Sequence, residues 1–471
     1  MQMEEWLERI YLMSWKKFAE FIVDVDFKKR ISYQSHEYIK KLIIDTIFCS
    51  IAGSKGPYAE TIIKTFTKIS NSEQSSIICS HQKTSIHYAA LVNSFLARNY
   101  TFDDVYEPGI IHSGAAVIMS SFALGEWLQA SIDESLAAII SGYEVALRVA
   151  DAINPSHYDK GFHPTGTCNA IGVAALASKL FCLDEEKIIT ALRLAADMAC
   201  GFRQYQVDGN IANSAFHAAK AAENGIVAAM LAKEGFSDPG DTISGKFGLF
   251  NSMADGCKEK KLFEGLGTTF RFLETSLKPY PSCRYMHGAV DAAAKCKNKS
   301  NLITKDIKKI NVYTYRMAFE EGNRPHPKTV LDGQFSIHYN IATHFLKNTI
   351  GIEDFTQEGI QKKETLELCR KINVYEDREL TKKYPEQWPY RVEIITESGQ
   401  VFNHEVLFLP GSPANPLSTE EFEKKCLLLA KPVIGDEKGK ELFNRLQNIE
   451  AFLTVDNLFN YLKVLTAVGG N

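Results

Sequence analysis

Two adjacent carboxylates and a histidine lie close together early in the sequence. Asp103 and Asp104 are followed by His112, just before a long apolar run that begins at Gly114. A histidine with a pKa near neutrality is a candidate acid or base for proton transfer. The alternative is a loop in which the acidic residues cap the helix that follows. Both interpretations stay open at this point.

A second histidine, His163, lies in the compact stretch Gly161–Thr167, which reads Gly-Phe-His-Pro-Thr-Gly-Thr. We expect this stretch to be a pinned loop, and the small-residue run Cys168–Ala177 to be a tightly packed helix. The N-terminus of a helix favours negative charge, so a titratable loop that leads into one is a candidate place for chemistry. A hydrogen-bonded structural histidine is the alternative.

A third stretch, residues 277–287, presents lysine, cysteine, arginine and histidine within eleven positions. Two prolines stiffen it, and its functional groups belong to Lys278, Cys283, Arg284 and His287. Arginine can hold a carboxylate through two parallel hydrogen bonds, and clefts between domains are preferred places for ligands. The segment therefore predicts an anion-binding site, with a basic surface loop as the alternative.

Motifs for several other chemistries are absent from the sequence. It contains no GxxxxGKS/T phosphate loop, no GxGxxG after a strand, no HExxH and no GxSxG. No set of histidine, cysteine and carboxylate residues has the spacing of metal ligands. We therefore expect any activity to depend on the histidine, lysine and arginine clusters.

Helices are predicted for most of the chain up to about residue 270. Apolar residues recur at helical spacing in 38–52, a helix that Gly53 ends, and another helix is expected at 88–99. The next helices are rich in Ala, Gly and Ser, which lets helix axes approach closely. They predict a dense bundle, with some faces meeting another subunit, and are expected at 114–130, 133–149, 170–181, 184–198 and 215–233.

Beyond residue 270 the apolar pattern changes to the period of two that is typical of strands. Strands are expected at 309–315, 371–375, 390–395 and 401–409, the last two forming a hairpin, and helices at 287–297, 334–347 and 356–369. A stretch rich in proline at 410–416 ends this part, and a capping box at Ser418 opens further helices up to 467.

The predicted fold is mainly α, with a smaller α+β domain inserted into a large helical domain built from both chain ends. We expect the helical domain to comprise residues 1–270 and 410–471, and the α+β domain residues 271–409.

The composition is that of an ordinary globular protein, with 45% hydrophobic and 23% charged residues and a net charge of −4. This balance gives no global attraction to nucleic acid or to an anionic membrane. No apolar run reaches about 18 residues, so no membrane span is expected. The first six residues lack the features of a signal peptide, and ten cysteines without a CxxC pair predict reduced thiols. We therefore expect a cytoplasmic protein.

The three clusters, in this order, resemble the MmgE/PrpD family, which includes 2-methylcitrate dehydratase and cis-aconitate decarboxylase. The likeness covers most of the chain. It rests on a series of short motifs, namely Asp45-Thr46 with Ala52-Gly53, Val92-Asn93, Phe102-Asp103-Asp104, Gly142-Tyr143-Glu144-Val145, Gly161–Thr167, Ala221-Ala222-Glu223-Asn224-Gly225, Lys278–Arg284, Gln334-Phe335-Ser336-Ile337 and Asn415-Pro416-Leu417-Ser418.

The resemblance implies that the α+β domain is a lid, that the helical domain forms a homodimer, and that tricarboxylic acids react without a metal or an organic cofactor. Matched by motif, the expected catalytic residues are His163, His112 and Lys278. Substrate contacts are expected from a larger set, namely Asp104, Thr165, Thr167, Ser214, His217, Cys283 and Arg284.

Several residues depart from the family pattern, among them Val105, which replaces a usual threonine. Thr101 replaces the first residue of an Asp-Phe-Asp-Asp motif, and Arg98 occupies a position often held by histidine. Ser214 replaces a lysine, and Cys283 stands where the decarboxylases carry a histidine. The chain has therefore lost an aspartate and a lysine of the family pattern, while two site histidines and Lys278 remain.

Proton removal at one carbon and return at another is the simplest reaction that such a site suits, with either histidine as the base. Nearby cations would stabilise the carbanion. We therefore expect isomerisation of cis-aconitate to trans-aconitate. The alternatives are decarboxylation of cis-aconitate to itaconate, dehydration of 2-methylcitrate, and an inactive homologue that binds a tricarboxylate.

Overall fold

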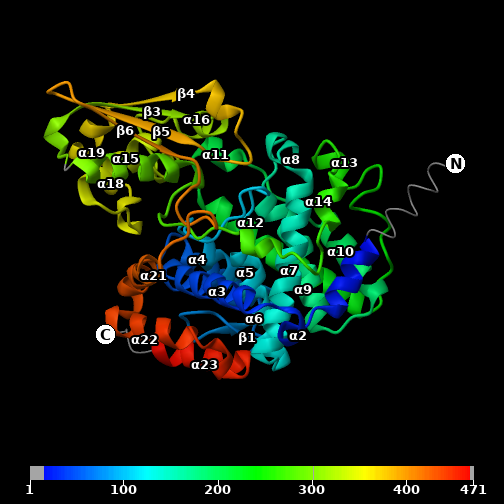
Figure 1. The fold of residues 1–471 in the computed structure, drawn as a ribbon. Helices are drawn as coiled ribbons and strands as arrows, with labels where there is room; N and C mark the ends of the chain where they lie inside the picture. The colour runs from blue at the N-terminus through cyan, green and yellow to red at the C-terminus, as the bar shows by residue number, and fades with distance from the viewer. Residues whose placement is uncertain (1–14, 301, 467–471) are drawn as a thin grey trace.

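The computed structural model describes residues 15–300 and 302–466. It is mainly helical, with a small sheet at one end (Figure 1). The first six residues, in which no signal peptide is expected, lie outside the described residues. The predicted helix end at 467 lies outside them as well. Among the described helices, none combines the length and apolar character needed to cross a membrane.

Six helices form the centre of the helical part, and small residues bring their axes close together. Nearly every residue of α9 is buried, and an added Cβ on Gly172 would lie 2.6 Å from the carbonyl oxygen of Gly142 in α7. This contact explains the glycine at that position, because no side chain fits there. The six helices are α5 (Ile86–Arg98), α6 (Gly114–Leu128), α7 (Ile132–Ile153), α9 (Pro164–Leu180), α10 (Glu185–Asp197) and α12 (Ala212–Lys233).

The C-terminal helices return to the first ones in the chain. Helix α21 (Thr419–Ile434) begins with the predicted capping box and packs on α3 (Tyr33–Gly53), and α23 (Val455–Thr466) packs on α6 (Figure 1). One buried apolar cluster therefore joins residues 15–277 with 422–465. We call this the helical part. Its other elements are α2 (Phe27–Arg30), α4 (Ala59–Ile69), α8 (Ser156–Asp159), α11 (Gln204–Asp208), α13 (Leu249–Met253), α14 (Glu259–Phe263), η1 (Arg271–Glu274), α22 (Asp436–Leu446), η6 (Ile449–Phe452) and the strand pair β1 (Ser75–Ser76) and β2 (Lys83–Thr84).

A second buried apolar cluster, within residues 285–409, forms what we call the sheet part. Its four strands lie in the order β4-β3-β5-β6, with β3 parallel to β4 and antiparallel to β5, and with β5 and β6 forming the expected hairpin. Buried and partly exposed residues alternate along β5, and α15 packs on β5 and β6. The strands are β3 (Ile307–Thr314), β4 (Ile372–Glu376), β5 (Tyr390–Thr396) and β6 (Val401–Val406).

Short helices complete the sheet part and correct two predictions. The helix expected at 334–347 is two helices, because Ser336 caps a new one by accepting a hydrogen bond from the backbone N–H of Tyr339. The region 356–369 likewise holds η5 and α19 instead of one helix. The remaining elements are η2 (Arg284–Met286), α15 (His287–Ser300), η3 (Thr304–Asp306), α16 (Arg316–Gly322), α17 (Val330–Gln334), α18 (Ile337–Lys347), η4 (Ile352–Asp354), η5 (Gly359–Gln361), α19 (Lys363–Cys369) and α20 (Arg378–Thr381).

The third correction concerns the stretch Gly161–Thr167, which is a loop only as far as His163. Helix α9 begins at Pro164, four residues before the small-residue run Cys168–Ala177 that was expected to form a helix, with His163 as its N-cap. Proline is favoured at the first helical position because its missing N–H would have no partner there. The histidine therefore stands at the start of the helix instead of one turn before it.

Candidate active site

The three clusters found in the sequence converge on one narrow cavity of about 40 Å³ between the helical part and the sheet part. It is lined by the end of α5, the loop 101–112, His163, helices α11 and α12, and the segment 278–285. Phe335 and Trp388 of the sheet part close it. Of the predicted site residues, the lining includes His112, His163, Ser214, Lys278, Cys283 and Arg284.

The hydrogen bonds of His112 fix the tautomer of its ring. Its Nδ1 lies 2.6 Å from the backbone oxygen of Asp104. A carbonyl oxygen only accepts, so Nδ1 carries the proton, and Nε2 of the neutral ring has a free lone pair. Burial, together with the charges of Arg98 and Lys278, lowers the pKa of His112 well below its ordinary value. The ring is therefore neutral at pH 7 and ready to accept a proton at Nε2.

His163 and His217 form a pair of hydrogen-bonded rings. Their Nδ1 atoms lie 2.9 Å apart, so one proton lies between them. Burial lowers the pKa of both, to about 4 for His217 and well below the ordinary value for His163. His217 does not line the cavity, and it reaches the site through His163. The pair can pass a proton from ring to ring only if one of the two outer nitrogens accepts or releases it.

Two of the three side-chain nitrogens of Arg284 have hydrogen-bond partners, and the third has none among the described residues. Its Nε donates to Glu107 at 2.9 Å, and its Nη1 donates to the carbonyl oxygen of Pro410 at 2.6 Å and lies 3.3 Å from Nδ1 of His287. Its buried Nη2 has no hydrogen-bond partner among the described residues. A buried donor without an acceptor is costly. This nitrogen is therefore suited to an anionic ligand.

Two further cations line the cavity. Lys278 is fully buried and donates to the carbonyl oxygen of Thr101 at 2.7 Å, and burial lowers its pKa to about 8. Arg98 is paired with Asp103 at 2.5 Å and donates to Ser214 Oγ at 3.1 Å, but its buried Nε has no partner among the described residues. Together with Arg284 these residues offer three cationic groups to one small space.

Besides His217, three predicted contact residues lie outside the cavity lining and are bound within the protein. Asp104 accepts hydrogen bonds from the backbone N–H of Gly114 at 2.9 Å and from the Tyr143 hydroxyl at 2.8 Å. Thr165 accepts from the backbone N–H of His112, and Thr167 Oγ1 lies 2.8 Å from Nε2 of His157. These contacts position the segment that carries His112 and the start of α9.

Burial and the charge of Asp103 raise the pKa of Asp104 to about 7. Burial also raises the pKa of Cys283 to about 11, so its side chain lines the cavity as a neutral thiol. None of the ten cysteines is joined to another by a disulfide. No group of three or more histidine, cysteine or carboxylate side chains within the described residues is arranged to hold a metal ion.

Comparison with known protein families matches both halves of the chain. The profile described as the MmgE/PrpD N-terminal domain matches residues 16–261, and that of the MmgE/PrpD C-terminal domain matches residues 280–449. The chain belongs to the MmgE/PrpD family. The resemblance found in the sequence is thereby confirmed.

Curated MmgE/PrpD relatives align with the chain over most of its length. A cis-aconitate decarboxylase of Aspergillus terreus is 23% identical over 450 residues, which are 90% of this chain and 91% of that protein. The cis-aconitate decarboxylase of Homo sapiens is 24% identical over 438 residues, or 87% of this chain and 86% of that protein. The corresponding mouse protein is 24% identical over 437 residues.

Arg98 is the cavity residue that the sequence analysis missed as a functional group. It had been noted only as a departure from the MmgE/PrpD pattern. A usable signal was present, because Arg98 ends a helix whose preceding residues, 89–97, are nearly all apolar or small. Arginine is rarely buried without a partner, so its place at the end of such a run predicts a buried ion pair or a ligand contact.

Proposed function

We propose that this MmgE/PrpD enzyme transfers a proton at a carbon next to a carboxylate of a tricarboxylic acid, and that it converts cis-aconitate to trans-aconitate. The observation that carries the proposal is the hydrogen bond from Nδ1 of His112 to the Asp104 carbonyl. It leaves Nε2 unprotonated in a cavity that Arg98, Lys278 and Arg284 also line. A neutral base beside cationic groups is what proton removal next to a carboxylate requires.

The three cations correspond in number to the three carboxylates of aconitate. Arg98 and Arg284 each keep a buried N–H without an acceptor, and Lys278 donates only to the Thr101 carbonyl. Because Asp103 and Glu107 partly neutralise the arginines, Lys278 is the one of the three without a carboxylate bound to it in the structure. We assign the carboxylate next to the reacting carbon to Lys278.

In the proposed reaction, His112 Nε2 removes a proton from the CH₂ carbon of cis-aconitate. The electron pair of the broken C–H bond spreads over the double bond and the neighbouring carboxylate, where the cations stabilise it. A proton then returns to the carbon at the other end of the three-carbon unit. The double bond has moved by one position, the product is trans-aconitate, and no other reactant is consumed. The His163–His217 pair is the alternative proton donor for the second step.

Decarboxylation of cis-aconitate to itaconate is the second candidate, and the names of the aligned relatives favour it. That reaction breaks a carbon–carbon bond, releases CO₂ and delivers a proton to carbon, so it needs an acid that is protonated before the reaction starts, whereas isomerisation returns a proton that the base has just removed. The lowered pKa values of His112 and His163 favour neutral rings, which act as bases and not as acids. The histidine expected in decarboxylases at the position of Cys283 is also missing here. These two features support isomerisation.

Incubation of the purified protein with cis-aconitate in D₂O, followed by ¹H NMR, tests the proposal. We expect trans-aconitate to form, with deuterium at the carbon that receives the returning proton. The rate should be unchanged in EDTA, because the proposal assigns every proton transfer to a side chain. Itaconate as the product would establish the second candidate instead. No reaction with cis-aconitate or 2-methylcitrate, together with tight binding measured by calorimetry, would identify an inactive tricarboxylate-binding homologue.

A further inference from the structure

The cavity around His112 is too small to admit the proposed substrate as it stands. Its volume of about 40 Å³ is well below the roughly 150 Å³ of a protein cavity that holds a benzene molecule. A tricarboxylic acid is several times larger than a water molecule. The substrate must therefore enter by displacing some part of the cavity wall.

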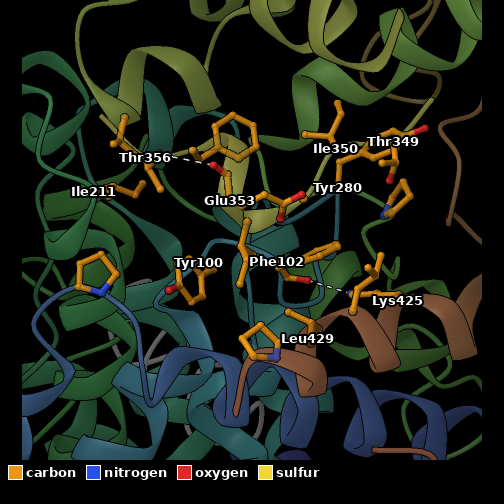
Figure 2. A pocket seen from close by; sticks show the side chains of 18 of the residues that line it. Tyr100, Phe102, Ile211, Tyr280, Thr349, Ile350, Glu353, Thr356, Lys425 and Leu429 are labelled. Atoms are coloured by element: carbon orange, nitrogen blue, oxygen red, sulfur yellow. Dashed lines mark hydrogen bonds between the residues drawn. The ribbon is translucent and has the colours of Figure 1, made fainter. Parts of the chain in front are cut away.

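A much larger cavity, of about 1010 Å³, lies on the other side of one wall. Figure 2 shows its two sides, with Tyr100, Phe102, Lys425 and Leu429 from the helical part facing Tyr280, Thr349, Ile350, Glu353 and Thr356. It is wide enough for a tricarboxylic acid and also lies between the helical part and the sheet part. This places it where a ligand on its way to the small cavity would pass.

Two backbone segments and one side chain contribute to the wall between the cavities. Thr101 lines the small cavity, whereas its neighbours Tyr100 and Phe102 line the large one. This alternation accompanies a left-handed backbone at Thr101, with φ of 57°. In the same way Lys278 lines the small cavity and the following residues, 279 and 280, line the large one.

Among the described residues, Ile211 alone lines both the large cavity and the small one. It precedes helix α12, which carries Ser214, and it packs against the small apolar cluster of Tyr205, Leu331 and Phe335. Figure 2 shows Ile211 at the margin of the large cavity.

The other parts of the wall are fixed by buried hydrogen bonds. Lys278 donates to the carbonyl oxygen of Thr101 at 2.7 Å, and Lys425 donates to that of Phe102 at 2.9 Å. Moving either segment would leave a buried polar group without a partner, which is costly. The alkyl side chain of Ile211 is only partly buried and forms no hydrogen bond, so its displacement leaves no polar group without a partner. It is therefore the part of the wall that opens most easily.

We propose that the large cavity is the entry route for the anionic substrate and that Ile211 is the gate between it and the small cavity. The inference rests on the proposed function for the identity of the substrate, but the route itself concerns any small molecule that reaches the small cavity. Ile211 acts on passage and takes no part in the chemistry.

Alkylation of Cys283 measures passage without any need for turnover. Cys283 lines the small cavity and not the large one, so a reagent that enters through the gate must pass Ile211 to reach it. The full-length protein is treated with iodoacetamide, and the modified peptides are quantified over time by mass spectrometry. Cys182, which is exposed, serves as the internal reference.

Ile211→Ala should raise the alkylation rate of Cys283 and Ile211→Trp should lower it, each about tenfold, which corresponds to about 1.4 kcal/mol in the barrier to passage. The rate at Cys182 should stay constant. Ile350→Ala is the matched control, because Ile350 lines only the large cavity. It should leave the Cys283 rate unchanged. Unfolding temperatures confirm that each variant is folded.

An unchanged Cys283 rate in both Ile211 variants would overturn the gate, and so would equal effects of Ile211→Ala and Ile350→Ala. The result separates the two proposals. If alkylation responds to Ile211 but cis-aconitate does not react, the gate stands and the proposed reaction fails. If cis-aconitate reacts but alkylation ignores Ile211, the reaction stands and the gate fails.

Discussion

The two cavities share a wall but differ in what their lining groups have left to bind. In the small cavity, Arg98 and Arg284 keep buried N–H groups without acceptors, and Nε2 of His112 has a free lone pair. In the large cavity, Lys425 is bound to Asp45 at 2.5 Å and to the Phe102 carbonyl, and Glu353 is bound to Lys347. The proposed route therefore rests on volume, whereas the proposed place of the chemistry rests on unused hydrogen-bonding capacity.

Exchanging one histidine in each cavity tests this difference most strongly. His112→Gln removes the proposed base, and we expect kcat for cis-aconitate to fall by about 10²- to 10⁴-fold, with little change in KM. His344→Gln is the matched control in the large cavity. His344 is also partly buried, and burial lowers its pKa to about 4. Its replacement by glutamine should nevertheless leave kcat unchanged. Steady-state assays by NMR or ultraviolet absorbance measure both.

Equal losses in the two histidine variants would remove the functional distinction between the cavities. Retained activity in His112→Gln, with loss in His163→Gln, would keep the distinction and transfer the role of base to the other histidine. Circular dichroism and unfolding temperatures exclude a general loss of structure as the cause.

The second comparison concerns stability and two neighbouring lysines that both line the large cavity. Lys425 is buried and paired with Asp45, whereas Lys424 is exposed. Lys425→Met leaves Asp45 as a buried charge without a partner, and we expect it to lower the free energy of unfolding by about 3–5 kcal/mol. Lys424→Met should change it by less than about 0.5 kcal/mol. Denaturant titration measures both values.

The double variant Asp45→Asn/Lys425→Met should recover much of the stability that Lys425→Met loses. It removes the unpaired charge and leaves polar and apolar groups of similar size. If the single variant Lys425→Met were as stable as the wild type, the pair would contribute nothing to holding the segment that carries Thr101 and Phe102.

The sequence predicted the general architecture because its patterns were local and strong. The alternation of Tyr390, Val392 and Ile394 identifies β5, and the runs of small residues identify the central helices. The break at Ser336 was missed because apolar residues on both sides of it keep helical spacing. Only the capping hydroxyl of Ser336 signals a new helix start, and the same serine would also be tolerated within a helix.

For the site, local chemistry and family resemblance selected His112, Lys278 and Arg284, which the fold brings to one cavity. Local chemistry and family resemblance did not show which groups Asp104, Thr165 and Thr167 bind. Their oxygens are equally able to bind a substrate or a backbone N–H, and the start of α9 at Pro164 and of α6 at Gly114 decides which they do. The catalytic and binding roles of all these residues remain predictions.

The last comparison is between the wild-type protein, with the buried Lys278, and the variant Lys278→Arg, whose side chain stays charged at every pH used. Burial lowers the pKa of Lys278 to about 8, so its ammonium group is lost as the pH rises through that value. If this charge binds a substrate carboxylate, kcat/KM should fall above pH 8, by about tenfold at pH 9, since kcat/KM reports groups of the free enzyme. In Lys278→Arg the guanidinium stays charged. The activity that remains should therefore show no decline near pH 8, and an unchanged decline would assign it to another group. Lys278→Met should bind substrate weakly at every pH, because no cation is present to be lost.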